Sequence, residues 1–105
     1  MYSYYSFKTD CLSNTWETVE IENYLCSFSI FIEKGNGTFT SQNPFLSISL
    51  MKVKDWDSWS GLDYDKDETN YVAIVTSSKD YHDTNVKTLL KGLEQLLNSR
   101  ICPDW

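Results

Sequence analysis

The sequence predicts an α+β domain, an antiparallel sheet of four to five strands packed against one C-terminal amphipathic helix. Three patterns predict this class. Apolar residues recur at helical spacing near the C-terminus, and in the first half of the chain they alternate with polar residues. A short β-branched run lies between these two regions. The 105 residues leave room for one domain, which we expect to span residues 1–105, and 41% hydrophobic residues supply its core.

Two minor strands are expected near the N-terminus. The tyrosine-rich start of the chain, residues 2–7, can add a strand at the edge of the sheet. A weaker strand is expected from Glu17 to Ile21, because Val19 and Ile21 alternate with glutamates.

The main hairpin is expected from two alternating runs. The first extends from Tyr24 to Glu33 and carries apolar residues at its even positions, Tyr24, Cys26, Phe28, Ile30 and Ile32. The second passes through Leu46, Ile48 and Leu50. Gly35-Asn36-Gly37 suits a turn. The polar stretch from Thr38 to Pro44 is then either a long hairpin tip or a break at Asn43-Pro44.

The last two elements have the clearest patterns. Tyr71 to Val75 is short, aromatic and β-branched, as expected of a central strand that is buried on both faces. A helix is expected from Thr84 to Ser99, capped by Asp83 or Thr84, with one apolar stripe of Val86, Leu89, Leu90, Leu93, Leu96 and Leu97. Gly92 costs about 1 kcal/mol relative to alanine inside a helix, which suggests that a bulky side chain or a strand packs closely there.

The charge of the chain argues against nucleic-acid binding and is concentrated in one segment. Nine basic residues face fifteen acidic ones, a formal net charge of -6, whereas nucleic-acid binders need an excess of lysine and arginine. Residues 55–68 hold one lysine against six carboxylates. This segment joins the second hairpin strand to the central strand, so we expect it at one rim of the sheet.

The same segment also contains Trp56, Trp59 and Tyr64, and this mixture favours protein binding. Carboxylates attract a basic partner and accept hydrogen bonds from arginine, while aromatic rings supply contact area. The predicted partner-binding residues are Asp55, Trp56, Asp57, Trp59, Asp63, Tyr64, Asp65, Asp67 and Glu68. The alternative is a solvated loop whose two tryptophans turn inward to cover the core.

Calcium binding is the competing interpretation of this segment. Asp63, Asp65 and Asp67 match the first three ligand positions of an EF-hand loop. Position 6 is Glu68 where glycine is needed, and position 12 is Ile74 where a bidentate glutamate is needed. We therefore expect no specific metal site, and adventitious divalent binding is left open.

No motif in the sequence indicates catalysis. His82 is the only histidine, and its place before the helix is typical of a surface or capping residue. No phosphate-binding glycine loop or nucleophile motif is present. We expect neither an enzyme nor a cofactor.

The cysteines and the N-terminus indicate a reducing compartment. Cys11, Cys26 and Cys102 are odd in number and lack a zinc-site spacing, so reduced thiols are expected. The N-terminus lacks the basic and apolar regions of a secretory signal, and no segment is apolar enough to span a bilayer. We expect a cytoplasmic protein with no membrane partner.

The chain resembles the small acidic immunity proteins that bacteria pair with toxins, including those of contact-dependent growth inhibition systems. The resemblance rests on size, acidity, a single sheet-plus-helix domain and the segments Asp55-Trp-Asp-Ser-Trp59 and Asp63-Tyr-Asp-Lys-Asp67. It implies a protein that neutralises a basic toxin, a nuclease domain, by blocking its active-site cleft.

Two other functions are left open. A phage-type nucleic-acid mimic would spread its carboxylates over a long face, and their concentration in one segment counts against it. A structural homo-oligomerising module could use the tyrosine-rich N-terminal strand, since an unpaired strand edge invites strand addition. We expect a monomer or a weak dimer.

Overall fold

The computed structural model describes residues 2–10, 13–35, 37–54 and 64–103. Its main sheet has six strands in the order β3-β4-β5-β7-β1-β8, and every neighbouring pair is antiparallel. These strands are β1 (Tyr2–Lys8), β3 (Glu33–Gly35), β4 (Thr38–Gln42), β5 (Phe45–Met51), β7 (Tyr71–Ser77) and β8 (Cys102–Pro103). A two-stranded sheet pairs β2 (Trp16–Glu17) with β6 (Glu68–Thr69).

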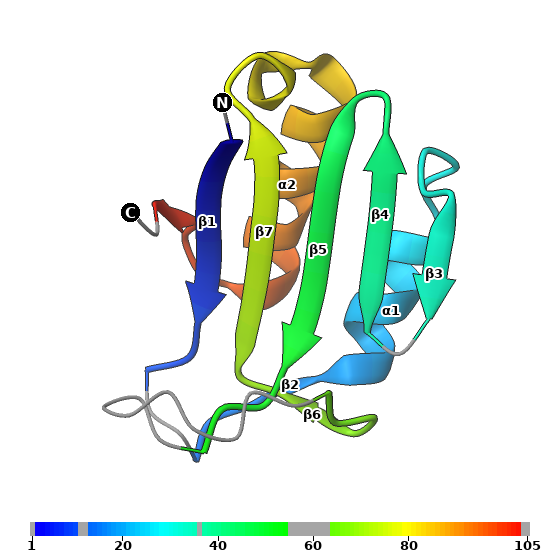
Figure 1. The fold of residues 1–105 in the computed structure, drawn as a ribbon. Coiled ribbons are helices and arrows are strands. Elements are labelled where there is room, and N and C mark those ends of the chain that lie inside the picture. The colour runs from blue at the N-terminus through cyan, green and yellow to red at the C-terminus, as the bar shows by residue number, and fades with distance from the viewer. Residues whose placement is uncertain (1, 11–12, 36, 55–63, 104–105) are drawn as a thin grey trace.

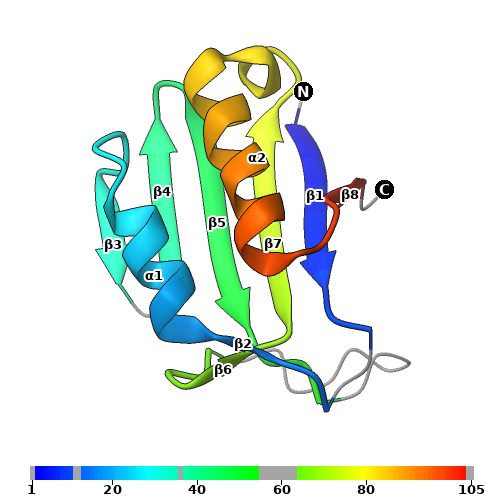
Figure 2. The same ribbon diagram turned by 180° about the vertical axis from the view of Figure 1, so that it is seen from behind.

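Two α-helices, α1 (Thr18–Cys26) and α2 (Thr84–Leu97), lie on one face of the main sheet (Figures 1 and 2). A short 3-10 helix, η1 (Asp80–His82), connects β7 to α2. The predicted α+β class is confirmed. The prediction was one sheet of four to five strands and one helix. The main sheet has six strands, and the described residues add the β2–β6 pair and a second α-helix, α1.

The core lies between the helices and the central strands β5 and β7. Leu46, Ile48 and Leu50 of β5 point toward the helices and are buried, whereas Ser47 and Ser49 lie on the opposite face. The predicted central position is confirmed, because β7 pairs with β5 on one side and with β1 on the other. The predicted burial of both faces is wrong, since Ala73 and Val75, on the face away from the helices, are only half-buried.

Helix α2 has nearly the predicted bounds, and Asp83 is its cap. The Asp83 carboxylate accepts hydrogen bonds from the amides of Asn85 (2.8 Å) and Val86 (3.4 Å). The helix ends at Asn98, whose φ of 49° is left-handed. The apolar stripe is narrower than predicted, because Leu96 is 40% exposed while the other five members are buried.

The two strands predicted over residues 17–21 and 24–33 are wrong. Most of this stretch forms α1, followed by a turn, and only residues 33–35 enter the sheet as β3. Thr18, Ile21 and Leu25 follow a helical spacing, and all three are fully buried. The even-numbered alternation does not describe burial, since Cys26 and Ile32 are exposed.

The predicted hairpin between residues 24–33 and 46–50 is therefore also wrong. Strand β5 pairs instead with β4, which forms from the polar stretch that was expected to be a hairpin tip. Phe39 of β4 is buried opposite Ile48, which explains why this stretch joins the sheet. The predicted break at Asn43-Pro44 is the turn between β4 and β5.

The tyrosine-rich start forms β1, as predicted, but it is not the outermost strand. Strand β8 lies outside it and pairs only with Tyr5 and Ser6 (Figure 1). Cys26 and Cys102 are free thiols, and Cys11 lies outside the described residues. No helix in the described ranges has the length and apolarity needed to cross a membrane.

Candidate protein-binding surface

The predicted partner-binding segment lies on the chain between Val53, just after β5, and β6. The structure describes four of its nine predicted residues, Tyr64, Asp65, Asp67 and Glu68. The other five lie outside the described residues: Asp55, Trp56, Asp57, Trp59 and Asp63. The alternative in which the two tryptophans turn inward concerns the same residues and stays untested. The contacts on either side of residues 55–63 can be followed in detail.

Before the segment, the chain is fixed by the buried side chain of Asn70. Its amide oxygen accepts a hydrogen bond from the Val53 amide (2.7 Å), and its amide nitrogen donates to the Val53 carbonyl oxygen (2.9 Å). The Asn70 backbone amide also donates to the Met51 carbonyl oxygen (3.1 Å). Both Val53 and Asn70 are almost fully buried. The chain thus leaves the sheet from a fixed point two residues before Asp55.

After the segment, Tyr64 is held against the β3–β4 turn and α1. Its ring covers Gly37, where a Cβ atom would overlap it. Its hydroxyl donates to the Glu22 carboxylate (3.2 Å to Oε2). Partial burial, followed by the nearby charge of Glu22, raises the pKa of Tyr64. The side chain is still 37% exposed, so its edge can contact a partner.

Asp65 organises the turn that leads into β6. One carboxylate oxygen accepts the backbone amides of Asp67 and Glu68, both at 2.8 Å. Its carbonyl oxygen accepts the buried Thr18 hydroxyl (2.8 Å). The hydrogen bonds from the Glu68 and Asp67 amides lower the pKa of Asp65. This carboxylate therefore stabilises the local fold.

The negative charge of Glu68 is compensated by Lys52, the residue that follows β5. Its Oε1 atom lies 2.7 Å from Lys52 Nζ, and its Oε2 atom accepts the Thr15 hydroxyl at 3.1 Å. The Lys52 hydrogen bond lowers the pKa of Glu68, and the same bond raises the pKa of Lys52. Asp65 and Glu68 therefore both contribute to the local fold. Asp67 is exposed, and its carboxylate has no partner in the described part of the chain.

Helix α1 brings further carboxylates to this end of the sheet. Glu17 lies directly opposite Glu68 in the β2–β6 pair, an arrangement of like charges that disfavours strand pairing. Glu22 lies against Tyr64. We call Glu17, Glu22 and residues 64–68 the acidic rim, whose β2 and β6 strands lie at the lower end of the sheet in Figure 1. Sequence reasoning missed both glutamates because their approach to residues 64–68 depends on the β2–β6 pairing and on the position of α1 in the folded chain.

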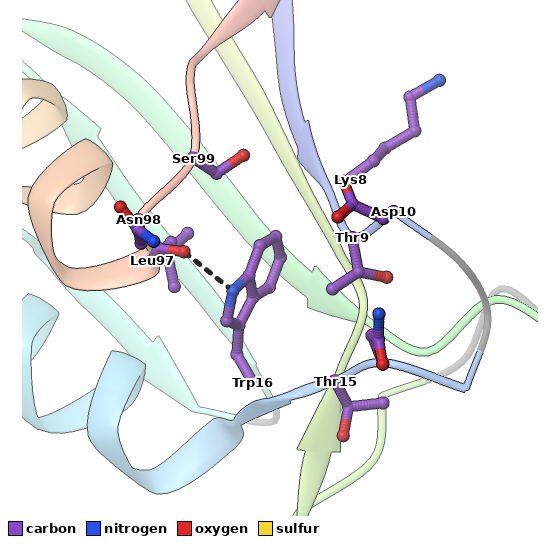
Figure 3. Close-up of a pocket in the computed structure, with 9 residues that line it drawn as sticks. Lys8, Thr9, Asp10, Thr15, Trp16, Leu97, Asn98 and Ser99 are labelled. Carbon is purple, nitrogen blue, oxygen red and sulfur yellow. Dashed lines mark hydrogen bonds between the residues drawn. The ribbon is translucent and has the colours of Figure 1, made fainter.

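Trp16 connects the acidic rim to the end of α2. Its indole nitrogen donates to the Leu97 carbonyl oxygen (3.1 Å), one of the carbonyls that the helix leaves unpaired (Figure 3). The half-buried indole forms one wall of a polar pocket of about 170 Å³ lined also by Lys8, Asp10 and Ser99. Pockets for small molecules hold roughly 300–1,000 Å³, so we interpret this one as a structural gap.

Metal ligands and the single histidine are the other candidate functional groups of the chain. The described residues contain no group of three or more His, Cys, Asp or Glu side chains placed to hold a metal ion. Two positions of the EF-hand pattern are unsuited to calcium. Asp65, at the second ligand position, already accepts hydrogen bonds from two backbone amides, and Ile74, at the last position, is buried in β7. His82 is exposed and its ring packs edge-on to Tyr81, with 5.7 Å between ring centroids.

Comparison with known proteins adds no relative. No protein-family model matches the chain, and neither do curated proteins or solved structures. The structure by itself defines the class, an α+β protein with an acidic rim at one end of an antiparallel sheet.

Proposed function

We propose that the protein is an inhibitor that binds a basic protein partner through residues 55–63 and the acidic rim. The observation that carries this proposal is the way the acidic segment is held. Asn70 fixes the chain before it, and Tyr64 with Asp65 fixes the chain after it. Binding residues are often carried on a connecting segment whose two ends are fixed on a rigid scaffold.

The residues of the surface divide into two roles. Asp65 and Glu68 have internal partners and act as positioning residues. Asp67 and the edge of Tyr64 are exposed and available for direct contact. The proposal adds the acidic and aromatic side chains of the intervening segment, Asp55, Trp56, Asp57, Trp59 and Asp63. The carboxylates would speed encounter with a basic surface, and the aromatic rings would supply most of the binding energy.

The partner that best fits this chemistry is the nuclease domain of a bacterial toxin. Such a domain presents a basic cleft to its nucleic-acid substrate, and an acidic protein that covers the cleft blocks it sterically and electrostatically. We propose accordingly an immunity protein of the contact-dependent growth inhibition type, which acts in the cytoplasm. It requires neither a cofactor nor a reaction of its own.

The proposal predicts that the gene directly upstream encodes a large secreted protein with a basic C-terminal nuclease domain, and the experiment uses that domain as the partner. We expect tight binding, loss of its nuclease activity, and an association rate that falls as salt rises. Replacing Asp55, Asp57 and Asp63 with asparagine should abolish both effects. The matched control, D10N with E20Q and E33Q, removes three carboxylates elsewhere and should retain binding. Equal loss in both triple variants, or no binding by the wild-type chain, would overturn the proposal.

Self-association is a second candidate, supported by the outer edge of β1, which β8 covers only in part within the described residues. Because Thr9 donates its amide to Asn70 on the β7 side (3.2 Å), strand alternation turns the amides of Tyr2 and Tyr4 away from β7. Strand β8 reaches only Tyr5 and Ser6, and the side chains of Tyr2 and Tyr4 are 59% and 48% exposed.

Sedimentation velocity tests this candidate over micromolar concentrations. We expect a weak dimer that Tyr4→Pro dissociates, since proline removes the outward amide of Tyr4 and leaves the β7 pairing intact. A wild-type chain that stays monomeric throughout contradicts it. The nucleic-acid mimic has no comparable support, because the described carboxylates of the acidic rim gather at one end of the sheet.

A further inference from the structure

A second pocket, of about 370 Å³, lies between η1, α2 and the segment that follows α2. In Figure 2, α2 lies over β5 and β7, and the chain that follows α2 crosses to β8 on the far side of β1. The volume falls in the range of about 300–1,000 Å³ that is typical of small-molecule sites.

The floor of this pocket is apolar and held in place. Leu90 belongs to the buried stripe of α2 and is 4% exposed. Tyr81 stacks on Tyr5 of β1, with ring centroids 4.7 Å apart and planes inclined by 15°. Ile101 packs against the core from the C-terminal side. The three side chains therefore form a preformed surface for an aromatic ring or a short hydrocarbon chain.

The rim of the pocket is basic, in contrast to the protein as a whole. Lys87 and Lys91 are exposed one turn apart on α2, where like charges repel slightly. Neither forms an ion pair within the described residues. The one carboxylate of the pocket, Glu94, accepts a hydrogen bond from the Ile101 amide at 3.2 Å. The two ammonium groups are thus free to bind an external anion.

We propose that this pocket binds a small amphipathic anion, a ring or short hydrocarbon chain that carries one carboxylate or phosphate group. The apolar part would lie on Tyr81, Leu90 and Ile101, and the anionic group would lie between Lys87 and Lys91. The exposed His82 at the same mouth supplies a further hydrogen-bonding group. The inference is independent of the proposed toxin binding, since the pocket shares no residue with the acidic rim.

The experiment is an NMR titration of the full chain with three probes. Phenyl phosphate should cause saturable shifts of the amides of residues 81–82, 87–91 and 101. Inorganic phosphate, which lacks the ring, should bind at least about tenfold more weakly, and benzylamine, which reverses the charge, should cause no saturable shift. Phenylacetate in place of phenyl phosphate distinguishes a preference for carboxylate from one for phosphate.

Two charge-matched variants decide the outcome. Lys87→Gln with Lys91→Gln should weaken phenyl phosphate binding by about tenfold, whereas Lys34→Gln with Lys54→Gln should leave it unchanged. Both pairs replace exposed lysines, so folding is expected to persist. Equal affinities in the two double variants, shifts scattered over the surface, or tighter binding of benzylamine would each overturn the proposal.

Discussion

Tyr24 of α1 lies directly over Gly92 of α2, and its hydroxyl group occupies the space that a side chain at position 92 would fill. The Tyr24 hydroxyl donates to the Leu89 carbonyl oxygen at 2.8 Å, and a Cβ atom at Gly92 would overlap it. This contact joins α1 to α2. It confirms the expectation that Gly92 marks a close approach.

Replacing Gly92 with alanine should destabilise the protein although alanine is the better helix former. Helix propensity favours alanine by about 1 kcal/mol, but forcing Tyr24 off its position should cost more, for a net loss of about 1–2 kcal/mol. Urea unfolding measures the loss. In a Tyr24→Phe background the penalty should shrink, and Gln95→Ala on the exposed side of α2 should be nearly neutral. A more stable Gly92→Ala protein would show that the contact is unimportant.

Replacing Asp83 with alanine should weaken α2. The substitution removes the acceptor for the amides of Asn85 and Val86, and the loss of a helix cap typically costs about 1 kcal/mol. Thermal and urea unfolding should show this loss. Asp83→Asn retains an acceptor and should recover most of it. If both variants lose the same stability, the negative charge rather than the cap is what matters.

Asn70 should be among the most sensitive positions, because it satisfies two buried backbone groups of Val53. Asn70→Ala leaves the Val53 amide and carbonyl without partners, at a cost of about 2–4 kcal/mol. Exposed Asn23→Ala on α1 is the control and should change the stability by less than about 0.5 kcal/mol. In binding assays, Asn70→Ala should also weaken capture of a basic partner at concentrations where the variant is folded. Wild-type stability of the variant would contradict the assigned role.

The stability contributed by Asp65 and Glu68 should be lost in acid. Their pKa values are lower in the folded protein than in the unfolded chain, chiefly through the amide hydrogen bonds to Asp65 and the Lys52 hydrogen bond to Glu68. The stabilisation is therefore complete above the unfolded values of 3.8 and 4.5, and it falls as the pH drops through the lower folded values.

Asp65→Ala tests this dependence by urea unfolding at several pH values. The stability difference from the wild-type protein should be largest near about pH 7 and should narrow toward about pH 3. Asp67→Ala removes a neighbouring carboxylate that has no described partner, and it should cost less. A difference for Asp65→Ala that does not change with pH would mean that the hydrogen bonds to the charged carboxylate contribute nothing.

The elements that the sequence predicts well are those whose pattern repeats over many residues. The stripe of α2 runs through four turns, so a period near 3.6 is unambiguous. The β-branched run of β7 and the alternation of β5 are similarly clear. In each case one face must be buried wherever the element lies.

The candidate surface is predictable only in part. The acidic and aromatic composition of residues 55–68 is visible in the sequence, but the partners of that segment are not. Lys52 follows β5, Glu22 lies in α1 and Asn70 precedes β7, so their contacts depend on how these three elements are brought together. The division of the carboxylates into positioning and contacting groups follows from those contacts.

The sequence by itself determined the class of the fold, the position of α2 with its cap narrowed to Asp83 or Thr84, and the segment that holds the acidic charge. Only the tertiary structure decided the conformation of residues 17–33. Over so short a stretch, three helically spaced residues compete with a run of alternating ones, and local preference cannot separate them. Burial of Ile21 and Leu25, together with the fit of Tyr24 over Gly92, stabilises the helix. That helix then places Glu22 beside Tyr64 and completes the acidic rim.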